Sequence, residues 1–298
     1  MLKSSTMSDI QRISGTDEDR PFQHYSMKHR MISWVSRTLF DRYTYTVRHG
    51  LLRGMKRKGG LGWLPEALTG EYETAEHRFW RQLNLSGLIV YDVGAFEGLR
   101  TMFFASRAKH VVCYEPNPRN HARLTTNLRL NDLRNVTVRN VGVGAAPQEI
   151  EMAWDPTQPG GASVETAVAG SLRRRGSAKV EPIAITTLDL DRKAMNLPTP
   201  DLIKIDIEGW ELEALRGACA TLTECRPALY LEMHGETMRE KKRKAAAIVQ
   251  FLEAMGYESI EHVESGQRIG TGNSDAAAEG HLFATAAAGS MASAYGEV

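Results

Sequence analysis

Two glycines and two acidic residues are spaced as in a binding site for an adenosine-type cofactor. One apolar run ends at Asp92 and is followed by Gly94 and Gly98, and the next apolar run ends at Glu115, 17 positions after Gly98. Glycines let a backbone turn sharply and approach a ligand closely, and a carboxylate at the end of the next strand accepts both ribose hydroxyls. A dinucleotide site would carry G-x-G-x-x-G instead. The acid before Gly94 suits a cationic cofactor, so the pattern favours S-adenosylmethionine, and a methyltransferase over a nicotinamide dehydrogenase.

Further polar side chains end two other apolar runs. Asp206 and Glu208 follow one run, and Glu232 and His234 follow the next. Side chains alternate along a strand, so each pair shares a face, and in an open parallel sheet ligands bind beyond the carboxyl ends of the strands. We therefore expect three carboxylates and an imidazole to meet beside the cofactor. Methyl transfer to a hydroxyl gains from a general base, and the unperturbed pKa of His234 suits that role, with Asp206 or Glu232 orienting it.

Structural explanations compete with these catalytic roles. Glu208 can cap the following helix, and Glu232 and His234 can pair with each other at a solvated strand end. Lys204 is expected to be an ion-pair partner within the sheet. Oxygen and imidazole ligands can also hold Mg²⁺ or Mn²⁺, but methyl transfer to a hydroxyl does not require a metal, so we assign no metal site.

The elements that must position these residues alternate between strand and helix. This alternation indicates an α/β fold with a parallel sheet and right-handed crossovers. Two last extended segments, 259–263 and 281–284, are expected to close the sheet as an antiparallel pair, and 149–154 with 180–186 are expected to form a small β excursion. Strands are predicted at 88–93, 111–115, 136–141, 202–207 and 228–233, and helices at 72–83, 100–107, 120–130, 210–221 and 241–255.

The first 70 residues differ from the rest in pattern and charge. Residues 1–24 are polar and aperiodic, which predicts disorder. Residues 25–70 are predicted to be a basic, amphipathic, helical extension, either one helix or two helices broken near Gly50, because apolar residues recur at spacings of three and four from Ile32 to Leu51. Residues 1–70 hold 12 Lys and Arg against 6 Asp and Glu, whereas the remainder holds 25 against 30. The helix is expected to pack on the core, and a membrane-surface or anionic-partner contact through residues 30–58 is the alternative.

Composition limits the class of protein. A chain of 298 residues with 42% hydrophobic residues can bury one substantial core. Three cysteines without ligand spacing, and a polar N-terminus, indicate a cytoplasmic protein, with peripheral membrane contact as the open alternative. No apolar run reaches the roughly eighteen residues that span a bilayer. The mildly acidic remainder argues against a nucleic-acid partner.

Longer motifs resemble the FkbM-type S-adenosylmethionine-dependent methyltransferases. The most specific is Lys204-Ile205-Asp206-Ile207-Glu208-Gly209-x-Glu211, and the others are Asp92-Val93-Gly94-Ala95-x-x-Gly98, Tyr114-Glu115-Pro116-Asn117-Pro118, Asn127-x-x-x-Asn131, Thr187-Leu188-Asp189 and Glu232-x-His234. The resemblance covers about residues 70–285 and implies a class I methyltransferase domain over 71–286, with a seven-stranded, mostly parallel, Rossmann-like sheet and a flexible tail at 287–298. Residues 1–65 do not match the family core.

The resemblance also implies roles for individual residues. Asp206, Glu208, Glu232 and His234 fall where the substrate and the reaction centre lie in that family. The expected cofactor contacts are Asp92, Gly94, Ala95, Gly98, Glu115, Pro116 and, near the adenine, Asn140.

Two functions from different classes follow. The first is an O-methyltransferase that methylates a hydroxyl of a sugar, a glycan or glycolipid, or a polyketide-type small molecule. The second is a non-catalytic S-adenosylmethionine-binding interaction protein, tethered by its basic N-terminal helix, in which the acidic cluster would be dispensable. The sequence specifies neither the acceptor nor an oligomeric state.

Overall fold

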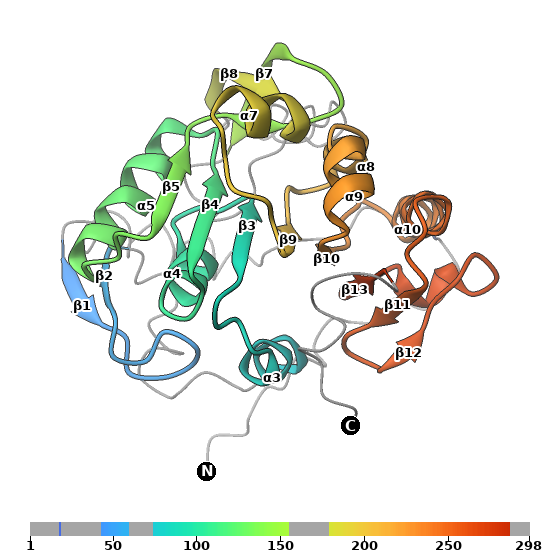
Figure 1. Ribbon diagram of the computed structural model, residues 1–298, viewed down its shortest axis with the longest axis horizontal. Coiled ribbons are helices and arrows are strands. Elements are labelled where there is room, and N and C mark those ends of the chain that lie inside the picture. Colours follow the sequence, from blue (N-terminus) through green and yellow to red (C-terminus); the bar gives the residue numbers. More distant parts are fainter. Residues whose placement is uncertain (1–17, 19–42, 60–73, 155–178, 287–298) are drawn as a thin grey trace.

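An eight-stranded sheet forms the centre of the computed structural model, which describes residues 18, 43–59, 74–154 and 179–286 (Figure 1). Its order is β12-β11-β13-β10-β9-β3-β4-β5. Neighbours from β10 to β5 are parallel, and β13, β11 and β12 continue the sheet as antiparallel strands. The strands are β3 (Ile89–Val93), β4 (His110–Tyr114), β5 (Val136–Arg139), β9 (Leu202–Ile205), β10 (Ala228–Glu232), β11 (Ser259–His262), β12 (Gln267–Arg268) and β13 (His281–Thr285).

The predicted α/β fold is confirmed, with one addition at the edge. The expected antiparallel closing pair is β11 with β13, and the two-residue strand β12 raises the count from seven to eight. Strand order reverses between β3 and β9, which are parallel neighbours although a long stretch of chain separates them. A reversal of this kind is where open α/β sheets bind ligands.

Helices cover both faces of the sheet (Figure 1). Alternation along β3 sends Val90 into one apolar cluster and Tyr91 into the other, and both side chains are fully buried. The Val90 face is covered by α3 (Ala75–Gln82), α4 (Leu99–Ala105) and α5 (Pro118–Leu130), and the Tyr91 face by α7 (Leu188–Ala194), α8 (Glu211–Arg216), α9 (Cys219–Cys225) and α10 (Met238–Ala254). A short 3-10 helix, η3 (Ser274–Ala277), precedes β13.

The expected β excursion is a separate three-stranded sheet. Its order is β6-β8-β7, with β6 at Gly142–Val143, β7 at Gln148–Trp154 and β8 at Lys179–Thr186. The antiparallel pair β7 and β8 buries Met152, Ile183 and Ile185 together. This small sheet stands beyond the carboxyl end of the large one, so it can wall a site there.

The predicted N-terminal helix is wrong where the structure describes that region. Residues 43–59 form a hairpin in which β1 (Thr44–Thr46) pairs antiparallel with β2 (Lys56–Lys58). Gly50 and Gly54 in the connection have φ angles of 75° and 89°, which a continuous helix does not tolerate. Leu51 between them is buried in the Val90-face cluster. The rest of the 25–70 prediction, residues 1–24 apart from Glu18, and the 287–298 tail lie outside the described residues.

Within the part of the chain that the structure describes, no helix is both long enough and apolar enough to cross a membrane.

Candidate active site

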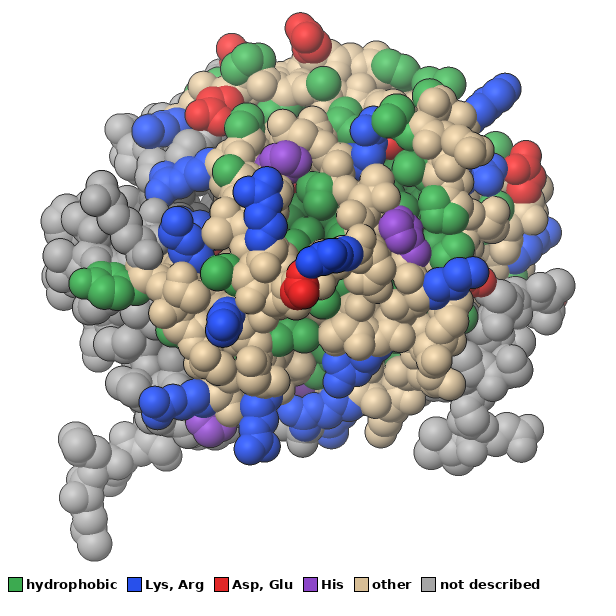
Figure 2. Space-filling model, turned by 60° about the vertical axis from the view of Figure 1, so that its left-hand side comes forward, with side chains coloured by type: hydrophobic (Ala, Val, Ile, Leu, Met, Phe, Trp, Pro, Cys, Tyr) green, Lys and Arg blue, Asp and Glu red, His purple; other side chains and the backbone are tan. Residues whose placement is uncertain are grey.

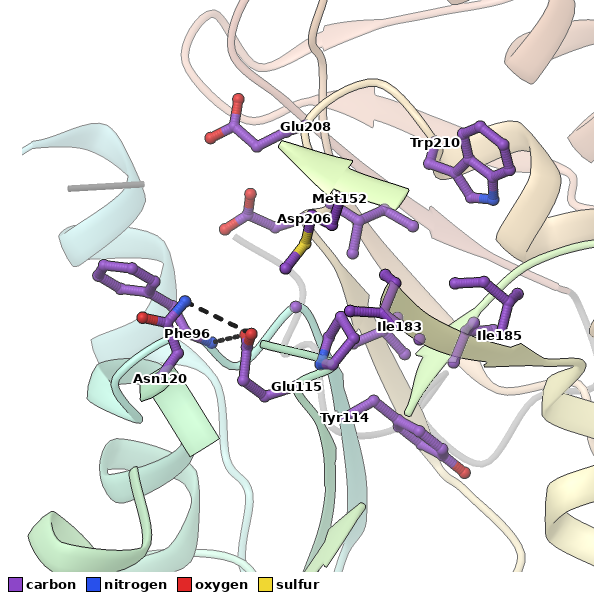
Figure 3. Close-up of a pocket in the computed structure, with 16 residues that line it drawn as sticks. Phe96, Tyr114, Glu115, Asn120, Met152, Ile183, Ile185, Asp206, Glu208 and Trp210 are labelled. Atoms are coloured by element: carbon purple, nitrogen blue, oxygen red, sulfur yellow. Dashed lines mark hydrogen bonds between the residues drawn. The ribbon is translucent and has the colours of Figure 1, made fainter. Parts of the chain in front are cut away.

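A pocket lies at the carboxyl end of β3, where the strand order reverses (Figure 3). The loop from Gly94 to Gly98 borders one side, and the apolar side chains of the small sheet border another. Gly94 has a φ of 85°, and a Cβ at this position would lie 1.8 Å from the backbone oxygen of Asp206. Only glycine therefore allows the ends of β3 and β9 to come together at the pocket.

Glu115 lines one end of this pocket and is almost fully buried. Its carboxylate accepts the backbone N–H groups of Phe96 and Asn117 at 2.8 and 2.9 Å and the amide of Asn120 at 3.4 Å. Burial outweighs these donors and raises the pKa of Glu115 to about 7. A carboxylate has about four lone-pair sites, so one remains for a ligand rather than the two that both ribose hydroxyls would need.

The four predicted catalytic side chains do meet. The Nε2 atom of His234 lies 3.8 Å from Asp206, 3.7 Å from Glu208 and 3.5 Å from Glu232. Asp206 and Glu208 line the pocket, and Figure 3 shows both carboxyl groups on the same side of it. Glu232 and His234 do not line the pocket, but His234 lies close to both of these residues and Glu232 lies close to His234. The register of β9 beside β10 produces this meeting, because Ile205 lies opposite Leu231 and both strands end together.

His234 does not have the unperturbed pKa that the sequence suggested. Burial alone would lower the pKa of His234, but the hydrogen bond to Glu211, 2.9 Å from Nδ1, and the charges of Glu208, Glu211 and Asp206 raise it to about 10. The imidazole is therefore protonated at neutral pH and cannot accept a proton there. This pKa disfavours His234 as the base, and its catalytic role stays a prediction.

Glu208 has the opposite character. Burial raises the pKa of Glu208 to about 7, although the neighbouring His234 lowers it. The backbone of Glu208 is left-handed, with a φ of 54°, and Gly209 follows at 102°. A left-handed non-glycine residue is uncommon and clusters at functional sites. This turn directs a carboxyl group with a near-neutral pKa into the pocket.

Asp206 remains ionised beside it. Burial alone would raise the pKa of Asp206, but the charges of Lys204, 2.9 Å away, and His234 hold it well below its usual range. Lys204 is buried and also lies 3.4 Å from Asp92. The sequence expectation for Lys204, an ion pair within the sheet, agrees with these contacts.

Several predicted cofactor contacts stand behind the pocket rather than in it. Pro116 lines it, whereas Asp92 is fully buried and accepts the hydroxyl of Thr101 at 2.6 Å. Asn140 donates to the carbonyls of Glu115 and Pro116 at 2.8 and 3.1 Å, so it holds that loop. Ala95 is buried and donates its N–H to the carbonyl of Tyr114, and Gly98, with a φ of 88°, starts α4 where a Cβ would lie 2.4 Å from Leu124.

Other residues of the site were not predicted. Glu211 holds His234 and is almost fully buried. Its position in the Lys204–Glu211 motif was the available signal. Asn120, Trp210 and the apolar wall of Met152, Ile183 and Ile185 also line the pocket. The wall had no sequence signal, because its residues come together only when β7 pairs with β8.

Comparison with known proteins identifies the family. A family model described as the methyltransferase FkbM domain matches residues 92–259. The chain belongs to the FkbM methyltransferase family. It is thus an S-adenosylmethionine-dependent methyltransferase, and the predicted enzyme class and cofactor are confirmed.

Individual relatives of this FkbM methyltransferase are distant. It is 27% identical over 176 residues to the 2-O-methyltransferase NoeI of Sinorhizobium fredii, and the aligned part is 55% of this chain and 70% of NoeI. It is 29% identical over 129 residues to the hexuronic acid methyltransferase AglP of Haloferax volcanii, and the aligned part is 43% of this chain and 49% of AglP. The crystal structure of methyltransferase FkbM from Methylobacillus flagellatus is 18% identical, with a TM-score of 0.43, covering 74% of this chain and 52% of that one.

The pocket of the FkbM methyltransferase suits its cofactor chemically. It combines an apolar wall, the buried carboxyl group of Glu115 at one end and the ionised Asp206 at the other, which match an adenine, a ribose and a sulfonium. The indole N–H of Trp210 is buried in the pocket lining and has no acceptor among the described residues. A buried donor without a partner is costly, and a heteroatom of a bound ligand would satisfy it.

Proposed function

We propose that this enzyme transfers the methyl group of S-adenosylmethionine to a hydroxyl of a sugar, either free or within a glycan or glycolipid. The observation that carries the proposal is Glu208, a pocket-lining carboxyl group with a pKa of about 7. An alcohol gains from a base as it attacks, and a base is most effective when its pKa lies near the working pH. The names of the two relatives, a 2-O-methyltransferase and a hexuronic acid methyltransferase, support a sugar acceptor.

The cofactor is assigned to the pocket between the Gly94–Gly98 loop and the small sheet. Glu115 accepts a hydrogen bond from the ribose, Gly94 and Pro116 allow close approach, and Asp206 faces the cationic end. Asp92, Ala95, Gly98 and Asn140 hold the loops that carry these contacts.

The acceptor is assigned to the carboxylate side of the pocket. When bound, S-adenosylmethionine supplies an electrophilic methyl group. Glu208 receives the hydroxyl proton of the acceptor while the oxygen attacks, and alignment of the two reactants contributes most of the acceleration. The His234 imidazolium, held by Glu211 and flanked by Glu232, balances the negative charge around Glu208.

A panel of free sugars, glycosides and sugar nucleotides tests the proposal, with radiolabelled methyl transfer as the readout. Glu208→Gln should lower kcat on the best acceptor by about 10²-fold, the contribution of a positioned base, and leave cofactor affinity within a few-fold. Asp275→Asn, which changes a carboxyl group outside the pocket, is the control and should retain turnover. Methyl transfer to a nitrogen or carbon acceptor only, or full turnover in Glu208→Gln, would contradict the proposal.

A further inference from the structure

An arginine from outside the family match reaches into the proposed cofactor loop. Arg57, in β2 of the N-terminal hairpin, is buried, and its guanidinium lies 2.6 Å from the carboxylate of Glu97. Glu97 belongs to the loop between Gly94 and Gly98 and is itself only 5% exposed. The match to the family begins at residue 92, so the loop lies within it and Arg57 does not. A charge-assisted hydrogen bond between buried groups fixes both side chains.

The hairpin that carries Arg57 is attached to helix α5 through the Asn127-x-x-x-Asn131 motif. The side chain of Asn131 accepts the N–H of Lys56 and donates to its carbonyl, both at 2.7 Å. The side chain of Asn127 accepts the N–H of Lys58 at 2.9 Å and donates to the carbonyl of Glu97 at 2.8 Å. A single amide thus bonds both the hairpin and the loop, so their positions depend on each other.

The loop from Gly94 to Gly98 in turn forms part of the pocket lining. Phe96, one residue before Glu97, lines the pocket and donates its N–H to Glu115 at 2.8 Å. Phe96 has a φ of 51°, so its conformation must be held by its surroundings. Contacts on both sides of it, from Glu115 inside the pocket and from Arg57 through Glu97 outside, provide that restraint.

We infer that the N-terminal hairpin is a positioning element of the methyltransferase site, and that Arg57 acts through Glu97 to hold the cofactor loop in its binding conformation. The inference rests on the proposed place of the cofactor at this loop. It gives a role to residues 43–59, which the resemblance to the family left without one.

Calorimetric titration of the full chain with S-adenosylmethionine tests the inference. Arg57→Gln and Glu97→Gln should each raise the Kd about tenfold, because a small displacement of a supporting contact is enough to misplace a binding group. The double variant should bind the cofactor no more weakly than the weaker-binding single variant, because both substitutions remove the same interaction between Arg57 and Glu97. Arg57→Lys keeps the charge and should recover part of the affinity. In turnover assays, KM for the cofactor should rise while kcat changes little.

Two further variants separate this role from a general loss of stability. Asp191→Asn breaks another shielded ion pair, in which Arg139 lies 2.6 Å from Asp191, and should lower the melting temperature without changing the Kd. Glu115→Ala tests the pocket itself. The inference would be overturned, and the proposed function left standing, by one result. In it, Arg57→Lys and any folded Arg57→Gln bind S-adenosylmethionine with a Kd within twofold of the parent, while Glu115→Ala binds it more weakly. If instead Glu115→Ala has an unchanged Kd while the Arg57 variants bind S-adenosylmethionine more weakly, Glu115 is not in the cofactor site. The coupling of hairpin and loop is then still supported.

Discussion

Three ionisable groups at the ends of β9 and β10 hold different charges although they are close neighbours. Asp206 is ionised because of Lys204, Glu208 titrates near neutrality because burial disfavours its charge, and His234 is a cation because carboxylates surround it. Environments that drive pKa values apart are how a site separates the group that moves a proton from those that hold charge. The structure therefore moves the proposed base from His234 to Glu208.

The pH dependence of turnover follows from this assignment. Glu208 is protonated below its pKa of about 7 and cannot then accept a proton, so log(kcat) should rise with pH and level off above about 7. His234→Ala removes a cation that lowers the pKa of Glu208, so the inflection should move to higher pH. Rate profiles of the parent and this variant on one acceptor provide the measurement. Loss of turnover at every pH, with no shifted inflection, would return the base role to His234.

At the scale of elements, the close approach of β3 and β9 sets the shape of the pocket. Gly94→Ala would place a Cβ 1.8 Å from the backbone of Asp206, which must force the two strand ends apart. Gly87 is a matched control, because its φ of 80° is equally left-handed but nothing lies within 4 Å of the added Cβ.

Urea unfolding should therefore separate the two alanine variants. Gly87→Ala should cost about 1–2 kcal/mol from its backbone conformation alone. Gly94→Ala should cost about 1–3 kcal/mol more through overpacking, and should also weaken cofactor binding. Equal losses in the two variants would mean that the contact between the strand ends is not tight.

The elements themselves were largely predictable, and the exceptions have physical reasons. Apolar runs ending in Asp92, Glu115, Asp206 and Glu232 located four parallel strands, because buried strands carry continuous apolar sequence. The apolar spacing in the N-terminal segment was misleading. Val47 and Leu51 keep a helical spacing, but Asn127 of α5 and Asn131 just after it hold the hairpin, which is a tertiary effect outside the local pattern. The pKa of His234 was unpredictable for the same reason, because Glu211 approaches it only in the fold.

At the scale of the whole molecule, the N-terminal hairpin and α5 together form a basic face. Residues 43–59 contain five Lys and Arg and no acid, and residues 118–134 contain four against one. The hairpin contacts α5, so these segments form one face, on which every Lys and Arg except the buried Arg57 is at least partly exposed. Figure 2 shows Lys and Arg side chains at the surface on this side of the molecule. The whole chain has a net charge of only +1, so the rest of it is acidic on balance. We propose that this basic face contacts an anionic membrane surface.

The proposed membrane contact depends on charge alone, so salt concentration and lipid composition should both change the binding. Sedimentation with vesicles rich in phosphatidylserine should pellet the protein at low salt, and phosphatidylcholine vesicles should not. Charge reversal at the exposed Arg53, Lys56 and Arg129 should weaken binding at least about tenfold, because each cation near such a surface contributes about 1 kcal/mol. Reversal of Lys193, Arg216 and Arg268, which are exposed on other elements, changes the net charge equally and should have little effect. Equal losses in the two triple variants, or tighter binding to a soluble polyanion than to the vesicles, would exclude a membrane-specific face.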